Sequence, residues 1–397
     1  MTDSDRLHLA GFRLLVLFSN RSPTDCRPLS CDKSPKEDTK IMIISRTPYR
    51  ISFFGGGTDY PSWYHQHGGA VLAVTIDKYC YLTCRYLPPF FEHRYRIVYS
   101  KIETINHLSE ILHPSVRESL RFIGMDRGIE LHHDGDLPAR SGMGSSSAFT
   151  VGLLNALHAL HGKMVNRHQL AMEAIHIEQE ILKETVGSQD QVMAAYGGLN
   201  HVRFLQSGEV VVRPLVMDRQ RTSQFNDHLM LFYTGIKRTA SEVASSYADD
   251  MSSRRRQLRI ISDLVEEGVE TLSGAGDLNR FGELLHEGWL AKRSFSPLVS
   301  NSHVDDIYDR AIASGALGGK LLGAGGGGFM LLFVPPDRQA KVAQELAGLI
   351  HVSFRFEFTG SQIAYYNPGL DYSNEDRIRR NANIDEFREL TEKPSYI

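Results

Sequence analysis

The residues of this chain best suited to do chemistry are a glycine- and serine-rich loop and two carboxylates that follow it. The loop runs from Leu137 to Ala148 and leads directly into a segment with apolar helical periodicity. Glycines let a backbone approach a ligand closely, and the amide N–H groups at a helix start favour anions. Serine hydroxyls add ligands for phosphate oxygens or for Mg²⁺. A glycine turn with a serine N-cap is the plainer alternative, and the loop matches neither the Walker A nor the G-x-G-x-x-G pattern.

The first carboxylate is Glu178, which lies in a predicted helix over 168–184. On a helical wheel Glu178 falls near the centre of an apolar face. Because burying a bare charge is costly, its carboxylate needs a partner there. A metal ion would supply that partner. A buried salt bridge, or an apolar stripe that ends in a solvent cleft, would serve equally well. The face is formed by Leu170, Ala171, Ala174, Ile175, Ile177, Ile181 and Leu182.

The second carboxylate is Asp190, in the segment Val186-Gly187-Ser188-Gln189-Asp190-Gln191. An aspartate in this position can simply cap the helix that follows. A carboxylate close to a phosphate-binding loop is also what a phosphoryl transferase needs to orient the attacking hydroxyl. Both interpretations are compatible with the spacing alone.

The elements that must position these groups form strands and then helices, twice along the chain. Strands, including 70–76 and 79–86, precede the helices of the first half. The second half restarts with strands over 199–204, 210–213 and 229–233. Helices over 240–272 and 278–293 follow them, and further strands that include 352–358 and 362–366 come last. This order predicts an α+β fold with two domains, 41–210 and 211–370. We expect residues 1–40 to be a disordered extension and residues 371–397 a charged tail.

Three motifs, in this order, make the chain resemble the GHMP kinase family, which includes galactokinase, homoserine kinase and mevalonate kinase. The first motif is Arg46 to Tyr60, the second is Pro138 to Ala148, and the third is Gly319 to Phe329. The resemblance covers about residues 41–366. It implies an ATP-dependent kinase of the two-domain GHMP fold, with an active-site cleft between the N-terminal and C-terminal α+β domains.

The resemblance also implies a role for individual residues. Asp190 would be the catalytic aspartate, with Arg50 as the cation beside it, and Ser146 and Glu178 would bind Mg²⁺. Substrate contacts would come from the first motif, and the third motif would line the cleft from the second domain. The implied ATP-binding residues are Pro138, Gly142, Met143, Gly144, Ser145, Ser146 and Ser147, and the implied substrate-binding residues are Gly56, Gly57, Thr58, Asp59, Gly325 and Gly326.

The first motif departs from the galactokinase form. Galactokinases have Gly-Glu-His-Thr-Asp where this chain has three glycines before Thr58 and Asp59, so two large polar groups are missing and galactose is a poor candidate. The motif instead resembles that of kinases for D-glycero-D-manno-heptose 7-phosphate. These phosphorylate the anomeric hydroxyl to give the 1,7-bisphosphate, a precursor of nucleotide-activated heptose.

A sugar that is already phosphorylated needs cations in its pocket, and arginine suits phosphate through its bidentate fork. Lys292 and Arg293 lie in the segment 289–301, which also resembles that subgroup. Arg203, Lys237 and Arg238 are further candidates. Three alternatives stay open: a kinase for another sugar such as fucose, a kinase acting on mevalonate, and a non-catalytic sensor of sugar and nucleotide. The intact set of Ser146, Glu178 and Asp190 argues against the sensor.

Composition limits the partners. The 397 residues carry a formal net charge of -3, so no global basic field invites nucleic acid. No apolar run reaches the length of a membrane span, and four cysteines are too few for a disulfide scaffold. We therefore expect a cytoplasmic enzyme with a small-molecule sugar or sugar phosphate substrate and without a nucleic-acid or membrane partner. A homodimer is allowed.

Removing residues 1–40 should change neither stability nor activity, because this segment has too little apolar content to build a core of its own. The test is the Tm and the turnover rate of a protein that starts at Met42, measured beside the full chain. The apolar patch Leu14 to Phe18 is the one feature that could dock, and a Tm lowered by several degrees on truncation would contradict the prediction.

Overall fold

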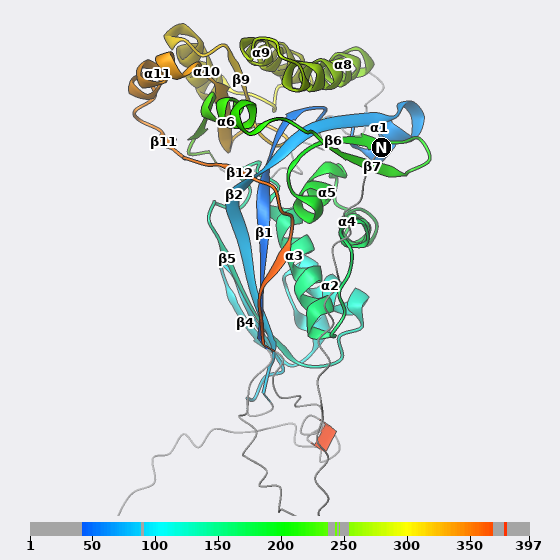
Figure 1. The fold of residues 1–397 in the computed structure, drawn as a ribbon. Helices are drawn as coiled ribbons and strands as arrows, with labels where there is room; N and C mark the ends of the chain where they lie inside the picture. Colours follow the sequence, from blue (N-terminus) through cyan, green and yellow to red (C-terminus); the bar gives the residue numbers. More distant parts are fainter. Residues whose placement is uncertain are drawn as a thin grey trace, which may run out of the picture. The chain divides into compact units, whose positions relative to one another are not determined.

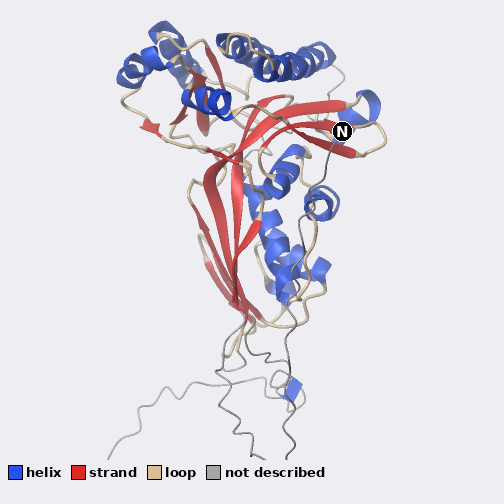
Figure 2. Ribbon diagram, viewed as in Figure 1, coloured by secondary structure: helices blue, strands red, loops and turns tan. Residues whose placement is uncertain are grey.

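The computed structural model describes residues 42–88, 91–236, 243, 246, 254–367 and 377–378. All of them belong to one compact unit, Thr39–Ile397. The predicted extension 1–40 and most of the predicted tail 371–397 lie outside the described residues. The α+β class predicted from the sequence is confirmed, since sheets and helices form separate layers (Figure 1, Figure 2).

The larger sheet has, within the described ranges, nine strands. Its main path runs β13-β1-β2-β5-β3-β4, and the long strand β2 also pairs with β6 and β12. All of its pairs are antiparallel except β3 with β5. The strands are β1 (Met42–Phe54), β2 (Gly69–Tyr86), β3 (Tyr95–Val98), β4 (Ile102–Ile105), β5 (Ile129–Gly135), β6 (Leu199–Phe204), β7 (Val210–Pro214), β12 (Phe356–Glu357) and β13 (Gln362–Asn367).

Helices cover one face of this sheet, as Figure 1 shows. The apolar helix α3 packs on both β1 and β2, and α5 also contacts both strands. A helix buried on nearly all sides must be apolar nearly all round, which explains the weak amphipathic pattern of α3. The helices of this half are α1 (Pro61–His67), η1 (Leu108–Glu110), α2 (Pro114–Ile123), α3 (Ser145–Leu160), α4 (Arg167–Ile175), the π-helical turn η2 (His176–Ile181) and α5 (Gln189–Tyr196).

The smaller sheet has four strands in the order β11-β8-β10-β9 among the described residues. Helix α9 packs on β9 and β10, and α8 packs on α9. Its strands are β8 (Leu229–Tyr233), β9 (Gly318–Leu321), β10 (Phe329–Phe333) and β11 (Ile350–His351). The helices are α6 (Arg219–Asp227), α8 (Arg255–Ser273), α9 (Asn279–Arg293), α10 (Ser302–Ser314), η4 (Pro336–Arg338) and α11 (Gln339–Glu345).

An aromatic cluster fixes the end of β1 against the second half of the chain. The ring of Phe53 lies 5.3 Å from the rings of both Phe225 and Phe281, and these two are 4.8 Å apart. Edge-to-face pairs of buried rings add to the apolar burial energy. The part of the first motif that follows β1, residues 55–60, therefore starts from a rigid point.

The structure differs from the predicted elements in three places. The strands expected over 70–76 and 79–86 form one strand, β2. The helix expected over 168–184 ends at Ile175 and continues as the π-helical turn η2. The strands expected over 352–358 and 362–366 supply β12 and β13, which pair with β2 and β1 of the larger sheet. Strand propensity marks a strand but does not choose its distant partner.

Candidate functional site

The site is organised by an ion pair between the first motif and the start of α5. Arg50 on β1 is buried, and its Nε and Nη2 each donate to an oxygen of Asp190 at 2.7 Å. This is the bidentate geometry in which guanidinium and carboxylate bind best. Asp190 lies in the first turn of α5 and keeps 24% of its side chain exposed. The structure therefore brings the two predicted catalytic residues together.

The second motif lies directly against this pair. Nη1 of Arg50 donates to the carbonyl of Gly142 at 2.7 Å, and the backbone N–H of Arg50 donates to the carbonyl of Met143 at 3.1 Å. Gly144 precedes α3 with φ of 72°, and a Cβ there would lie 3.3 Å from both Cγ of Arg50 and Oδ2 of Asp190. Both the backbone conformation and the close neighbours favour glycine at this position. The free amides at the start of α3 thus lie next to the Asp190 carboxylate.

The remaining residues of the second motif shape the same loop. The hydroxyl of Ser141 donates to the carbonyl of Pro138 at 2.6 Å, and the amide of Arg140 donates to Oγ of Ser145 at 3.3 Å. The Met143 side chain is buried. These contacts fix the path of the chain into α3, which is a property that a phosphate-binding loop needs.

The third motif packs on the second. A Cβ on Gly142 would lie 2.4 Å from the carbonyl oxygen of Leu322, and one on Gly323 would lie 2.5 Å from Cα of Gly142. The amide of Phe329 donates to the carbonyl of Ser141 at 3.2 Å. Two glycine-rich loops from distant parts of the chain therefore meet backbone to backbone. Gly325 and Gly326 contact Val299 rather than the second motif, with the Gly326 amide donating to the Val299 carbonyl at 2.8 Å.

Glu178 lies in the π-helical turn and is 1% exposed. Its Oε2 accepts hydrogen bonds from Oγ of Ser147 at 2.8 Å and from Nε2 of Gln191 at 2.5 Å, whereas its Oε1 has no partner. Burial raises the pKa of Glu178 from an ordinary 4.5 to about 7. An orphaned, buried carboxylate oxygen beside a serine hydroxyl fits an oxygen-seeking cation.

The serine beside Glu178 is not the one that the resemblance implied. Ser147 is buried and contacts the carboxylate, whereas Ser146 is exposed. The described residues hold no cluster of three His, Cys, Asp or Glu side chains that could bind a metal ion by themselves. A Mg²⁺ ion at Glu178 would therefore need oxygens from phosphate or water to complete its shell.

Asp59 of the first motif supports the loop that carries Asp190. It is 1% exposed, its Oδ1 accepts from the Gly57 amide at 2.9 Å, and its Oδ2 accepts from the Gln189 amide at 3.2 Å. Burial raises the pKa of Asp59, and the two amide hydrogen bonds oppose that rise only in part. Thr58 donates to the carbonyl of Ala70 at 2.9 Å. These residues are predicted substrate contacts, and their contacts within the chain hold the two loops together.

Two of the three glycines of the first motif, Gly56 and Gly57, are close to side chains of different elements. A Cβ on Gly56 would lie 3.6 Å from Nε2 of Gln189, and one on Gly57 would lie 3.0 Å from Leu258. Gly56 therefore faces the loop of Asp190, whereas Gly57, with φ of 106°, faces α8. A galactokinase-like Glu-His pair at this point would need a different arrangement of these neighbours.

Lys292 and Arg293, the two adjacent cations at the end of α9, lie in different environments. Lys292 is buried, and its Nζ donates to the carbonyls of Gly323 and Leu321, the latter at 3.5 Å. Burial, and after it the nearby charge of Arg50, lowers the pKa of Lys292 to about 8, although the charges of Asp59 and Asp190 act in the opposite direction. Arg293 is partly exposed and pairs with Asp305 of α10 at 3.3 Å.

Lys320 of the third motif is a residue that the sequence analysis missed. It is buried, and its Nζ donates to the carbonyl of Phe53 at 2.7 Å, which joins β9 to the end of β1. Burial lowers its pKa strongly, and the charge of Lys292 adds to this effect. The available signal was a lysine inside an apolar strand. Of the other cations, Arg203 is exposed on β6, and Lys237 and Arg238 lie outside the described residues.

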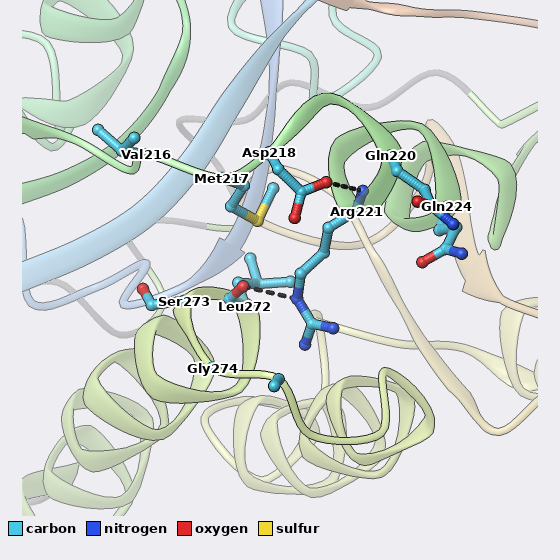
Figure 3. Close-up of a pocket in the computed structure, with 10 residues that line it drawn as sticks. Val216, Met217, Asp218, Gln220, Arg221, Gln224, Leu272, Ser273 and Gly274 are labelled. Carbon is cyan, nitrogen blue, oxygen red and sulfur yellow. Dashed lines mark hydrogen bonds between the residues drawn. The ribbon is translucent and has the colours of Figure 1, made fainter.

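A cavity of about 390 Å³ lies elsewhere, between α6 and the end of α8 (Figure 3). Arg221 lines it, and its Nε donates to the carbonyl of Leu272 at 2.8 Å. This contact satisfies a carbonyl at the C-terminal end of α8. None of the candidate site residues lines this cavity, so it plays no part in the site.

Comparison with known proteins agrees with this arrangement. The family model described as GHMP kinases N terminal domain matches residues 105–198, and the model described as GHMP kinases C terminal matches residues 260–349. A D-glycero-alpha-D-manno-heptose 7-phosphate kinase from Campylobacter jejuni is 27% identical over 327 residues, which cover 77% of this chain and 93% of that protein. A mevalonate kinase from Methanothermobacter thermautotrophicus is 30% identical over 248 residues, which cover 57% of this chain and 74% of that protein.

A solved structure has the same fold. The crystal structure of a D-glycero-D-manno-heptose 1-phosphate kinase from Bacteroides thetaiotaomicron matches with a TM-score of 0.67 at 24% identity, over 81% of this chain and 98% of that one. Among the helices that the structure describes, none is both long and apolar enough to cross a membrane.

Glu178→Gln should stabilise the ligand-free protein at pH 8 but not at pH 5. Because the pKa of Glu178 is raised on folding, the folded protein holds a proton that the unfolded chain releases between about pH 4.5 and 7. The free energy of unfolding therefore falls as pH rises through this window. Glutamine does not ionise, so the variant does not lose stability in this way. Thermal unfolding should show a Tm higher by a few degrees in the variant at pH 8.

The matched control is Glu180→Gln, because Glu180 lies in the same turn but is exposed. It should leave the Tm unchanged at both pH values. Adding ATP and MgCl₂ should then stabilise the natural protein more than Glu178→Gln. Equal Tm values for Glu178→Gln and the natural protein at pH 8 would contradict the claim that Glu178 is a buried carboxylate with a raised pKa that needs a cation.

Proposed function

The chain belongs to the GHMP kinase family, and from that premise we propose that it transfers the γ-phosphoryl group of ATP to the anomeric hydroxyl of D-glycero-D-manno-heptose 7-phosphate. As a sugar kinase of this family it uses ATP as phosphoryl donor. The product would be the 1,7-bisphosphate. The observation that carries the proposal is the Arg50–Asp190 pair, held against the loop that opens α3.

In the proposed reaction, a bond forms between the anomeric oxygen and the γ-phosphorus, and the bond from that phosphorus to the β,γ-bridging oxygen breaks. The electron pair leaves with ADP, and the proton of the hydroxyl passes to the Asp190 carboxylate. Arg50 fixes both oxygens of that carboxylate, so its free lone pairs have one orientation. Phosphoryl transfer depends mostly on such alignment and on charge neutralisation.

The residues around the loop support the binding of the phosphates. Amides at the start of α3 would hold phosphate oxygens. Glu178, with Ser147 or Ser146, would hold Mg²⁺, which when bound neutralises phosphate charge. Asp59, Gly56, Gly57 and Thr58 would contact the sugar after adjustment of the first motif, and Gly325 and Gly326 would line the same space. A cytoplasmic location and a homodimer stay predictions.

Support for heptose 7-phosphate comes from the first motif and from the relative that is named for this substrate. The glycines before Thr58 stand where galactokinases have two large polar groups, so the sugar contacts must differ from those of a galactokinase. A substrate phosphate adds roughly two negative charges. Arg293 at the end of α9, partly exposed and linked through Asp305 to the segment beside Gly325 and Gly326, is an available cation.

The direct test is ATP consumption with heptose 7-phosphate, fucose, galactose, mannose and mevalonate, using Asp190→Asn as the control variant. We expect turnover with heptose 7-phosphate well above that with the others, and loss of most of kcat in Asp190→Asn, since the transferred proton then has no acceptor.

At least one of the variants Lys292→Ala and Arg293→Ala should raise the KM for heptose 7-phosphate about tenfold or more, with the KM for ATP little changed.

The contrary results are distinct. Preference for an unphosphorylated sugar would move fucose-like substrates ahead. Preference for mevalonate would place the chain in the isoprenoid pathway. Absence of ATP consumption with every acceptor, in a protein that binds nucleotide, would favour the sensor.

A further inference from the structure

The cations around Asp190 outnumber the carboxylates. Arg50, Lys292 and Lys320 are buried in this region, and the charges that act on the two lysines come from Arg50, Asp59, Asp190 and each other. Arg50 and Asp190 neutralise each other in a bidentate pair. Asp59 alone is left to balance two lysines.

The two lysines differ in the hydrogen-bond acceptors of their ammonium groups. Lys320 donates to the Phe53 carbonyl at 2.7 Å, which ties it to the end of β1. Lys292 donates only to carbonyls of the third motif, and it forms no ion pair with any carboxylate among the described residues. An ammonium group has three N–H donors. With two carbonyl acceptors, one donor of Lys292 is available.

The carbonyls that hold Lys292 also place it. Gly323 is in backbone contact with Gly142, and the Gly142 carbonyl accepts from Arg50. Lys292 is thereby held next to the point where the two glycine loops meet, close enough to Asp190 and Arg50 for their charges to act on its ammonium group. A buried cation without a counter-ion is costly, and an anionic ligand would remove that cost.

We propose that the ammonium group of Lys292 binds an oxygen of the phosphoryl group in transfer, and so lowers the barrier of the reaction rather than holding the sugar's own phosphate. The inference rests on the proposed function. It assigns different tasks to two adjacent residues: Lys292 to the moving phosphoryl group and Arg293 to the substrate phosphate. Because charge builds on the transferred oxygens and the leaving oxygen as the γ-bond breaks, a fixed cation there counts most at the transition state.

The experiment compares Lys292→Gln and Lys292→Met with the natural full-length enzyme. Gln keeps a donor for the Gly323 carbonyl but has no charge, whereas Met keeps the volume and loses both. Arg280→Gln on the exposed face of the same helix is the matched control. We expect kcat to fall about 100-fold or more in both Lys292 variants, with KM for heptose 7-phosphate and for ATP changed less than about threefold, and no change in Arg280→Gln.

A normal kcat in Lys292→Gln would show that the lysine only ties α9 to the glycine loop, and would overturn the inference. So would a loss confined to the KM for heptose 7-phosphate, which would give Lys292 the sugar phosphate and leave the proposed function intact. Absence of turnover in the natural enzyme with every acceptor is a failure of the proposed function itself, and it removes the inference with it.

A measurement on the natural enzyme covers the case in which a variant does not fold. The groups facing Lys292 are Arg50 on β1, Asp59, Asp190 on α5 and Lys320 on β9. The ammonium is charged below about pH 8 and neutral above it. The pH profile of kcat/KM, which reports the free enzyme, should therefore fall on the alkaline side with a midpoint near pH 8. A flat profile from pH 7 to 10 would contradict the inference.

Discussion

The arrangement of the site depends on the guanidinium group of Arg50. Its three nitrogens hold both oxygens of Asp190 and the carbonyl of Gly142, so one side chain joins β1, α5 and the loop before α3. A lysine could not satisfy these partners in one plane, because it offers a point charge rather than a rigid fork. The proposed proton acceptor and the proposed phosphate-binding loop are thus set at a fixed separation before any ligand arrives.

The surrounding fold keeps Arg50 in place. Its strand is paired on both sides, with β2 and β13, and its end is fixed by the ring of Phe53 and by Lys320. On the other side, Gly187 leaves space for Asp59, whose carboxylate anchors the amide that precedes Asp190. A side chain at Gly187 would collide with the Asp59 carboxylate, because a Cβ there would lie 2.0 Å from Oδ2 of Asp59. Positioning is therefore shared between long-range strand pairing and a few close backbone contacts.

The sequence was sufficient for the parts of this site that are local or that follow a motif. Glycine spacing and the carboxylate on an apolar face predicted the loop before α3 and the buried Glu178, and the family resemblance paired Arg50 with Asp190. The features that the sequence could not predict depend on three-dimensional geometry. The helical wheel assumed a regular α-helix, but the Leu182 amide donates to the Ile177 carbonyl, five residues back, and this bond forms a π-helical turn at Glu178. Ser147 rather than Ser146 meets its carboxylate, and Lys320 acquires its role only when β9 reaches β1.

The claim that Arg50 acts through Asp190 is tested most directly by a double-mutant cycle on kcat, with Arg50→Gln, Asp190→Asn and the double variant, each checked for folding by its Tm. If the two residues work as one unit, the effects are far from additive. The account predicts that adding Arg50→Gln to Asp190→Asn costs less than about tenfold further, although Arg50→Gln alone costs on the order of 100-fold. A double variant whose loss equals the product of the two single losses would contradict it.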